Sequence, residues 1–369
     1  MKKIYPNNTL LFFVTIFTAL LISSCRKDHN NPVPVNPAPA PLATLGLYEV
    51  DSSIYKRVFI AITQVGTQKV NYFNVFDTGS AGMTIDATGI LPASMITNSG
   101  IQVAGDSVVV NGITVTSQEA VMAFGNAQSQ TQEYGNLAYA TVKIGDQNGS
   151  ITTSRIPMFL YYKVVDVTTG QKQPPHSNDI FGVGPGVSYA NSLIGSPLSY
   201  FSPKNGGING YKLALLSKSG FSLNGTYVSD LLTIGLVPDD IASSSGFIMH
   251  QLNYFSQGGY SPDIPSTITY GGQSFSATVL FDTGTPAISL LENSASPNNI
   301  STLPDNTPVT LTTNNGFTYQ YTTSSTTNVT DVAKPSYTSD PRTIFSINFF
   351  TDNEFLMNYR DHQIGLKNN

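Results

Sequence analysis

The chain has 369 residues, of which 40% are hydrophobic and only 11% are charged, with a formal net charge of −5. That length allows two lobes with separate cores, and a modest charge without a basic block argues against nucleic acid as the main partner. Glycine, serine, threonine, asparagine and tyrosine are abundant, which is typical of short strands joined by turns. Long windows of helical periodicity are absent, so we predict an all-β protein with few, short helices.

The first 24 residues resemble a bacterial lipoprotein signal peptide. A charged start at residues 1–3 precedes an apolar run at residues 10–22, and small residues then lead to Cys25, the single cysteine. The resemblance implies cleavage before Cys25, lipidation of its thiol, and an extracytoplasmic protein tethered to a bacterial membrane, with the outer membrane or cell surface expected. The alternatives are an ordinary signal peptide or an uncleaved anchor, although the apolar run is short for a spanning helix.

A proline-rich tether follows the signal, over residues 25–44. Prolines at positions 32, 34, 37, 39 and 41 disfavour helix and central strand, so we expect an extended spacer that gives reach from the membrane. A lipidated Cys25 leaves no thiol for a disulfide, so core packing alone is expected to hold the fold.

The folded part is expected to begin near Leu45. Apolar runs bounded by turn residues predict strands or buried segments in two halves, which we assign as an N-terminal lobe (45–245) and a C-terminal lobe (246–369). In the first half these segments are residues 55–65, 70–76, 108–115, 120–125, 139–144, 156–162 and 231–237. In the second half they are residues 246–253, 266–270, 274–281, 309–311, 318–322, 343–357 and 363–366.

One short motif occurs twice along the chain. Phe76-Asp77-Thr78-Gly79-Ser80 returns as Phe281-Asp282-Thr283-Gly284-Thr285, and each copy stands between two apolar runs. Each aspartate is therefore expected in a tight loop between two buried strands. Two such loops can bring the carboxylates of Asp77 and Asp282 together, and close carboxylates share one proton, so that one is a base and the other an acid. The pattern predicts hydrolysis without a metal.

The doubled motif resembles that of the pepsin-like aspartic proteases. Residues 139–145 resemble the strand after that family's flap, residues 179–184 the apolar-apolar-Gly segment behind the first catalytic loop, and residues 344–366 the closing segment. The resemblance implies a bilobal β fold with a cleft between two pseudo-symmetric lobes and one catalytic aspartate from each, Asp77 and Asp282. It also implies an aspartic endopeptidase that acts as a monomer on an extended polypeptide without a cofactor.

The same resemblance assigns supporting roles within the two loops. The threonines that follow the aspartates bond across to the opposite loop, and the last hydroxyls of the motifs donate to the nearer carboxylate. Glycine permits a close approach that a Cβ would block. The supporting residues are Thr78, Gly79, Ser80, Thr283, Gly284 and Thr285.

Three features depart from the family pattern. Ser346 stands where the segment behind the second loop has glycine, so the backing of that loop is expected to be altered. The flap residue is Phe124 in the best alignment, with Tyr134 as the competing choice. Met83 lies near the usual position of an aromatic partner for the flap tyrosine.

Other motifs have simpler explanations. The glycine-rich residues 182–186 lack the lysine and helix of a phosphate loop, so we expect them to pack against backbone. Residues 220–224 miss the second glycine of a serine-hydrolase elbow and are expected to form a turn. The four histidines, His29, His176, His250 and His362, have no paired spacing, and we expect no metal site.

Two other functions remain open from the sequence. A non-catalytic lipoprotein that binds a peptide or glycan in the same cleft would tolerate the changed flap and Ser346. An unrelated β-rich surface lipoprotein would require the doubled motif to be a coincidence.

Overall fold

The computed structural model describes residues 37–52, 55–126, 129–256 and 258–369. Residues 1–38 and 39–369 form two units, and every element below belongs to the second. The predicted signal peptide and Cys25 lie outside the described residues. Among the residues described, none of the helices combines the length and the apolar character that a membrane span requires.

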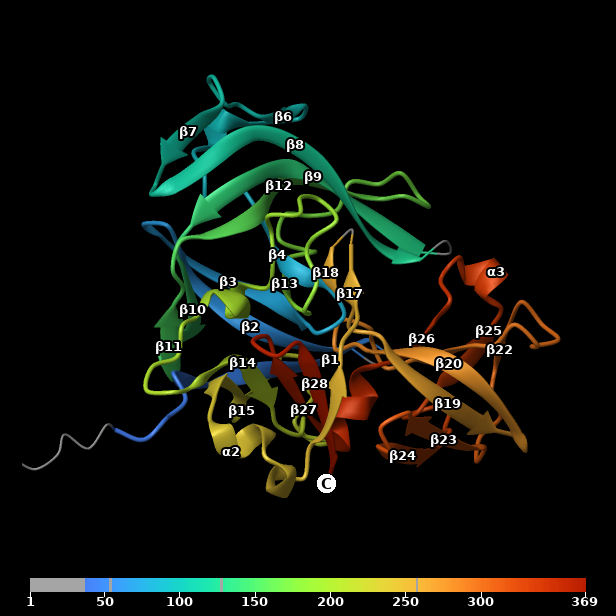
Figure 1. Ribbon diagram of the computed structural model, residues 1–369. Coiled ribbons are helices and arrows are strands. Elements are labelled where there is room, and N and C mark those ends of the chain that lie inside the picture. Colours follow the sequence, from blue (N-terminus) through green and yellow to red (C-terminus); the bar gives the residue numbers. More distant parts are fainter. Residues whose placement is uncertain (1–36, 53–54, 127–128, 257) are drawn as a thin grey trace, which may run out of the picture. The chain divides into compact units, whose positions relative to one another are not determined.

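Strands dominate the described chain, as the composition predicts (Figure 1). The helical elements in this part of the chain are each three to five residues long. They are α2 (Pro238–Ile241), α3 (Pro335–Thr338) and 3₁₀ turns at Ala93–Met95, Pro197–Tyr200, Ser243–Ser245 and Ile347–Thr351.

The larger sheet has 16 strands and takes most of the first half of the chain together with the C-terminal strands. Its strands in chain order are β1 (Ala43–Ser52), β2 (Tyr55–Val65), β3 (Gln68–Asp77), β4 (Ala81–Asp86), β7 (Ser107–Val110), β8 (Ile113–Asn126), β9 (Ser129–Ala140), β10 (Val142–Asp146), β11 (Gly149–Thr152), β12 (Ile156–Asp166), β13 (Ile180–Val183), β14 (Ile208–Leu213), β15 (Thr226–Leu236), β16 (Ile248–Gln251), β27 (Asn353–Asn358) and β28 (Gln363–Asn368). Figure 1 shows β27 and β28, in red, beside β14, so the chain end returns to the first sheet.

The second sheet has eight strands, all from the second half of the chain. They are β19 (Ile264–Tyr270), β20 (Gln273–Phe281), β21 (Ser289–Glu292), β22 (Ile300–Thr302), β23 (Pro308–Thr313), β24 (Thr318–Thr322), β25 (Thr330–Ala333) and β26 (Arg342–Phe345). Two small hairpins, β5 (Ile96–Thr97) with β6 (Gly100–Ile101) and β17 (Tyr254–Phe255) with β18 (Gly259–Tyr260), lie outside both sheets.

The two sheets repeat one arrangement around the two Asp-Thr-Gly motifs. In the first, β13 lies between β3 and β4, parallel to β3 and antiparallel to β4. In the second, β26 lies between β20 and β21, parallel to β20 and antiparallel to β21. Each Asp-Thr-Gly loop therefore leaves one strand, turns, and enters a second strand with a later strand inserted between them. This repeat defines two lobes of an all-β fold.

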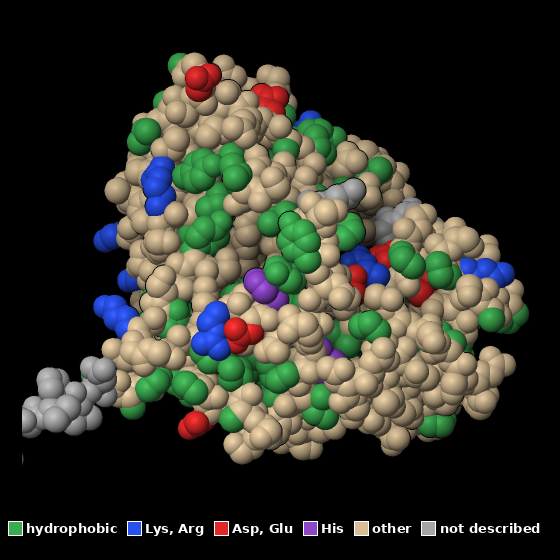
Figure 2. All heavy atoms as spheres, in the orientation of Figure 1, with side chains coloured by type: hydrophobic (Ala, Val, Ile, Leu, Met, Phe, Trp, Pro, Cys, Tyr) green, Lys and Arg blue, Asp and Glu red, His purple; other side chains and the backbone are tan. Residues whose placement is uncertain are grey.

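Side-chain alternation on the strands builds the core beneath these loops. On β2, Val58, Ile60 and Ile62 are fully buried, and their neighbours face the other side of the sheet. Burying such a side chain contributes about 1.5–3 kcal/mol. Charged side chains are sparse on the face in Figure 2, which is mostly uncharged polar surface and backbone.

Two predicted strands are each divided in the structure. Residues 108–115 are a hairpin rather than one strand, because Asn111 and Gly112 both adopt positive φ, 52° and 71°, and turn the chain between β7 and β8. Residues 139–144 are divided at Thr141, between β9 and β10. The closing segment at residues 343–357 spans most of β26, the turn at Ile347–Thr351 and most of β27.

Candidate active site

The two aspartates lie at equivalent ends of β3 and β20. Asp77 is the last residue of β3, and Asp282 directly follows β20. Phe76 and Phe281, the residues before them, are buried in the core and fix the ends of the two strands. The sequence therefore places each carboxylate on a short loop that is held by packing on both sides.

The threonines of the two loops bond across the junction between the lobes. The Thr78 hydroxyl donates to the Phe281 carbonyl oxygen at 2.8 Å and accepts from the Thr283 backbone N–H at 3.0 Å. In return the Thr283 hydroxyl donates to the Phe76 carbonyl oxygen at 2.6 Å and accepts from the Thr78 N–H at 3.0 Å. Both threonines are buried, so four hydrogen bonds shielded from water join the loops.

Each loop glycine makes room for the opposite aspartate. A Cβ on Gly79 would lie 2.5 Å from the carboxyl carbon of Asp282, and one on Gly284 would lie 2.6 Å from that of Asp77. Both distances are far below any allowed contact between carbon atoms. Glycine at both positions is therefore what lets the two carboxylates meet.

Hydroxyl and amide groups bind the two carboxylates in the same way. The Ser80 hydroxyl donates to Asp77 Oδ2 at 2.5 Å, and the Thr285 hydroxyl donates to Asp282 Oδ2 at 2.6 Å. The Gly79 N–H donates to Asp77 Oδ1 at 2.8 Å, and the Gly284 N–H donates to Asp282 Oδ1 at 2.7 Å. These bonds fix both carboxyl planes before any substrate arrives.

The two carboxyl groups interact strongly with each other. Burial above all, together with the negative charge and hydrogen bonding of Asp282, raises the pKa of Asp77 to about 8, against the lowering effect of Ser80 and Gly79. The pair therefore keeps one proton through neutral pH, with one carboxyl as an acid and the other as a base.

The segments behind the two loops differ, as Ser346 predicts. In the first lobe, a Cβ on Gly182 would meet the Gly82 carbonyl oxygen at 2.7 Å, so β13 packs directly on the loop. In the second lobe, Ser346 is fully buried and its hydroxyl lies 3.3 Å from the Ser289 hydroxyl. The Asp282 N–H still donates to the Phe345 carbonyl at 2.9 Å, so the backing strand remains in place beside the second loop.

The hairpin of β8 and β9 carries both flap candidates on opposite faces. Phe124 packs with Met122 against a small apolar cluster, and Met122 contacts Ser188, which lies beside the first catalytic loop. Tyr134 pairs with exposed Val121 instead, and the Lys163 amine lies 3.9 Å above its ring. Phe124 is therefore on the face turned toward the Asp77 loop, and Tyr134 is on the other face. Met83 belongs to the main core.

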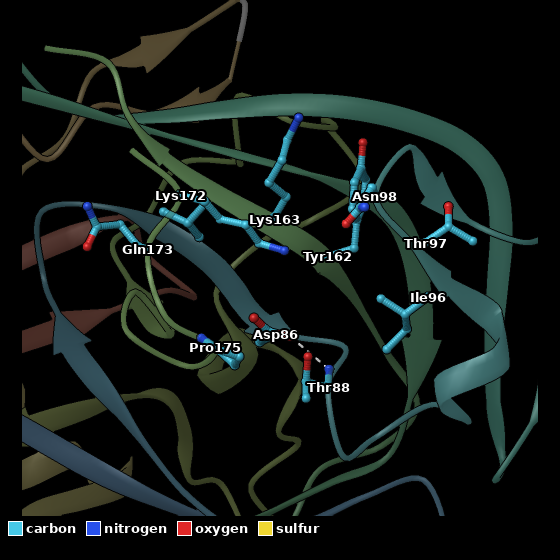
Figure 3. A pocket seen from close by; sticks show the side chains of 11 residues that line it. Asp86, Thr88, Ile96, Thr97, Asn98, Tyr162, Lys163, Lys172, Gln173 and Pro175 are labelled. Carbon is cyan, nitrogen blue, oxygen red and sulfur yellow. Dashed lines mark hydrogen bonds between the residues drawn. The ribbon is translucent and has the colours of Figure 1, made fainter. Parts of the chain in front are cut away.

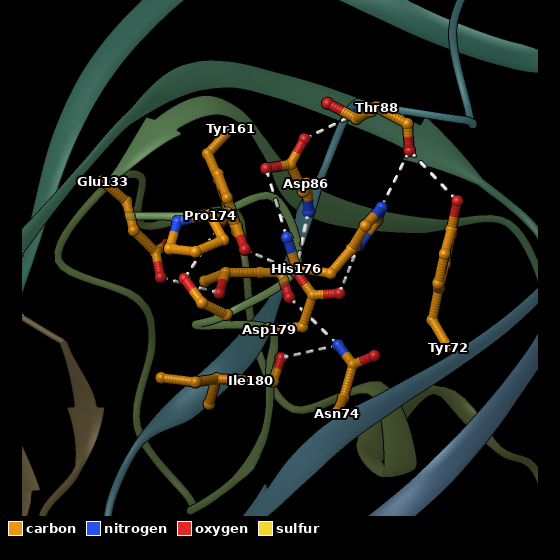
Figure 4. Close-up of polar contacts among 12 residues, drawn as sticks. Tyr72, Asn74, Asp86, Thr88, Glu133, Tyr161, Pro174, His176, Asp179 and Ile180 are labelled. Carbon is orange, nitrogen blue, oxygen red and sulfur yellow. Dashed lines mark hydrogen bonds and ion pairs between the residues drawn. The ribbon is translucent and has the colours of Figure 1, made fainter. Parts of the chain in front are cut away.

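A buried polar network ties the hairpin to the strands beside Asp77. Glu133 on β9 is fully buried and accepts from Asn178 at 2.6 Å and from the Thr84 hydroxyl of β4 at 3.4 Å (Figure 4). Burial raises the pKa of Glu133 well above its ordinary value, and the nearby charges of Asp179 and Asp86 add to this against the two hydrogen bonds. Glu133 therefore connects the β8–β9 hairpin to β4 through a hydrogen bond.

Asp179 and His176 form the second part of this network. Tyr161 donates to Asp179 at 2.6 Å, and His176 Nδ1 lies 2.7 Å from the other carboxylate oxygen (Figure 4). His176 Nε2 faces the Thr88 carbonyl oxygen at 2.9 Å, so both ring nitrogens meet acceptors. Burial lowers the pKa of His176, but the hydrogen bond and charge of Asp179 outweigh it and raise the pKa overall. The geometry suits an ion pair when His176 is protonated, and nothing in the sequence pattern indicated it.

A cavity beside β4 and β12 lies apart from the aspartates. It has a volume of about 390 Å³ and opens between the end of β4, the strand β12 and the segment 172–175. Asp86, Tyr162, Lys163 and Lys172 are among its lining side chains (Figure 3), and none of the residues of the Asp-Thr-Gly loops is. In the described part of the chain, no group of three or more His, Cys, Asp or Glu residues is arranged to hold a metal ion.

The fold is that of the pepsin-like aspartic proteinases. The aspartic proteinase of Irpex lacteus superposes with a TM-score of 0.53 at 15% sequence identity, over 89% of this chain and 97% of that one. Basic 7S globulin from soybean superposes with a TM-score of 0.55 at 13% identity, over 89% and 96% of the two chains. At these identities the likeness establishes the fold, and one neighbour is named a proteinase while the other is named a globulin.

No protein-family model matches the chain, and no curated protein matches it. The activity must therefore be argued from the residues of the site.

Proposed function

We propose that this protein is an aspartic-type endopeptidase that hydrolyses peptide bonds with a water activated between Asp77 and Asp282. The observation that carries the proposal is the reciprocal packing of each carboxylate against the glycine of the opposite loop. A purely structural aspartate needs only the N–H and hydroxyl groups of its own loop. Two carboxylates held against each other at a cost in electrostatic repulsion have a use in proton transfer.

The mechanism uses the single shared proton of the pair. The ionised carboxyl takes a proton from the water as the water oxygen attacks the peptide carbonyl carbon, and the protonated carboxyl donates to the carbonyl oxygen, which gives a tetrahedral gem-diol. The proton taken from the water is then delivered to the peptide nitrogen as the C–N bond breaks, and a gem-diol hydroxyl returns its proton to the other carboxyl, so that the pair again holds one proton. The Ser80 and Thr285 hydroxyls stabilise the charged form of either aspartate, so the roles can exchange when the products leave. The reaction requires no metal or cofactor, and the proposed substrate is an extended polypeptide in a cleft between the lobes.

The proposal includes the location of the enzyme. Both aspartates belong to one chain, which supports activity as a monomer. The lipoprotein-like signal supports attachment through Cys25 to a bacterial membrane, outside the cytoplasm. Replacing Cys25 by serine should shift the protein from the membrane fraction to the soluble fraction and prevent incorporation of labelled fatty acid.

The test of the activity is cleavage of a mixed peptide library, followed by mass spectrometry. Asp77→Asn and Asp282→Asn each remove one carboxyl of the pair at constant shape, so we expect cleavage to fall by at least about 1,000-fold in either variant. Asp106→Asn, which changes an exposed aspartate, is the matched control. Equal cleavage by the parent and either dyad variant would contradict the mechanism.

The second candidate is a non-catalytic protein that binds a peptide or glycan in the same fold. It is favoured by the soybean globulin among the structural neighbours and by Phe124, which has no hydroxyl, at the flap position. Binding of library peptides without any cleavage, unchanged in Asp77→Asn, would favour it over the endopeptidase.

A further inference from the structure

Arg57 is one strand away from the catalytic pair. The antiparallel register of β2 with β3 places Phe59 opposite Val75, and continuing it by two residues brings Arg57 to the level of Asp77. Since every second side chain of a strand faces the same side, Arg57 and Phe59 share a face with Val75 and Asp77. The buried Val58 on the opposite face confirms the alternation.

Among the described residues, the guanidinium of Arg57 has no counter-ion of its own. Arg57 is half-buried, and its Nη1 donates to the backbone carbonyl of Lys56 at 3.3 Å. Within the described residues it forms no ion pair, unlike Arg342 and Arg360, each of which pairs with an aspartate. Burial lowers the pKa of Arg57, while the negative charges of Asp282 and Asp77 raise it. The negative charges that act most on Arg57 are therefore those of the catalytic pair.

A half-buried guanidinium without a carboxylate partner is unfavourable, because its donors lose water without gaining a charged acceptor. Its fork of N–H donors matches a carboxylate better than any other peptide group. The neighbouring cation, Lys56, is oriented differently, since its amine lies 5.3 Å from the centre of the Phe221 ring. Arg57 is thus the cation of this strand end that faces the aspartates.

The residue pair next to Arg57 and Asp77 along the two strands is apolar. Phe59 and Val75, a cross-strand pair, are both half-buried on this face, and Ile180 of β13 pairs with Val75 on its other side. A peptide lying across these strands would set an apolar side chain on Phe59 and Val75. The peptide side chains that follow on the same face would then lie beside Arg57, because neighbouring strands are about 4.8 Å apart.

We propose that Arg57 makes this protein select polypeptides with an aspartate or glutamate within about two residues of the cleaved bond, next to an apolar residue. This inference rests on the proposed function, since it names the substrate class of the same site. Arg57 is a specificity residue, and it takes no part in the proton transfers.

The test compares peptides that are identical except for glutamate or glutamine at one position near the cleaved bond. In the parent, we expect kcat/KM to be at least about 10-fold higher for the glutamate peptide at one position. In Arg57→Gln this ratio should fall to about one, and in Arg57→Glu lysine should become the preferred residue. Lys56→Gln removes the same charge from the adjacent residue and should keep the parent ratio.

The outcomes separate the possibilities. An equal effect of Arg57→Gln on both peptides, with a shifted pH profile, would mean that Arg57 only tunes the aspartates and would overturn the inference. Retention of the glutamate preference in a folded Arg57→Gln protein would overturn it as well. If Arg57→Gln does not fold, Arg57→Glu and the charge-retaining Arg57→Lys decide by the same ratio.

Failure of the endopeptidase proposal is recognised separately, as an absence of cleavage by the parent. The same library is then captured on immobilised parent and Arg57→Gln protein. Enrichment of acidic peptides on the parent alone supports the role of Arg57, and equal capture by both proteins contradicts it.

Discussion

Asp77 and Asp282 receive matching hydrogen bonds from their own loops, yet Asp77 is 7% exposed and Asp282 is only partly buried. The Asp77 loop lies beside Gly182, the β8–β9 hairpin and the Glu133 network, whereas the Asp282 loop lies beside Ser346 and Ser289. The matching loops therefore set the same geometry for both carboxyl groups, while the burial of each carboxyl group depends on what packs around its loop.

The largest effect on stability is expected where the two loops are equivalent. Thr78→Val and Thr283→Val each leave a buried carbonyl and a buried N–H without a partner, so each should lower the free energy of unfolding by about 2–4 kcal/mol. Urea denaturation measures the change. Thr78→Ser and Thr283→Ser keep the hydroxyl and should cost much less. A clear difference in the free energy of unfolding between the two valine variants would contradict the equivalence of the loops.

A smaller effect should distinguish the two backing segments. Gly182→Ala forces a Cβ to within 2.8 Å of the Ser80 hydroxyl oxygen and should cost about 1–3 kcal/mol. Ser346→Ala removes one hydroxyl contact and leaves Ser289 as acceptor for the residue 346 N–H, so it should cost about 1 kcal/mol. Unfolding curves of both variants show which substitution lowers the free energy of unfolding more. A larger loss of stability at position 346 would contradict the proposed asymmetry.

The effect of pH on the free energy of unfolding should be comparable in size to the effects of these substitutions, but it should be spread over a wide pH range. Burial raises the pKa of Glu49 from its ordinary value of 4.5 to about 7, and burial also raises that of Glu133. A carboxyl whose pKa is raised on folding stabilises the protein below its unfolded pKa, and this stabilisation is lost as pH rises through the folded pKa. Unfolding free energy should therefore fall by on the order of 2 kcal/mol between pH 5 and pH 8.

His176 acts in the same direction, because its pKa is also raised, whereas burial lowers the pKa of His250 and opposes the trend. Glu133→Gln should flatten the dependence of stability on pH, because glutamine retains the shape of the protonated acid. Glu119→Gln, an exposed position on the same hairpin, should leave the slope unchanged. A parent protein that grows more stable from pH 5 to pH 8 would contradict the assignment.

Local sequence was sufficient for the parts of the site that the motif encodes. The doubled Asp-Thr-Gly pattern predicted the two loops, and strands such as 55–65 and 318–322 agree with β2 and β24 in both bounds. The hairpin at Asn111-Gly112 was missed although its dipeptide is a strong turn signal, because the apolar residues around it read as one run.

Other features depend on tertiary register, which the sequence alone does not give. Arg57 reaches the level of Asp77 only through the pairing of β2 with β3, over 20 residues of separation. Glu133 and Asp179 are acidic residues whose spacing gives no sign of burial, and Glu133 on β9 reaches Asn178, beside Asp179, only in the folded chain. Charged residues in strands usually face solvent, so burial of this kind is visible only in the folded chain.

The central claim is that Asp77 and Asp282 titrate as one pair that holds a single proton. The most direct measurement is the carbon-13 NMR titration of labelled aspartate carboxyls in the parent and in Asp282→Asn. The account predicts one carboxyl that titrates near pH 8 in the parent, with its transition moved to lower pH when the neighbouring charge is removed. Two carboxyls that titrate independently near the ordinary value of 3.8, unaffected by the substitution, would contradict it.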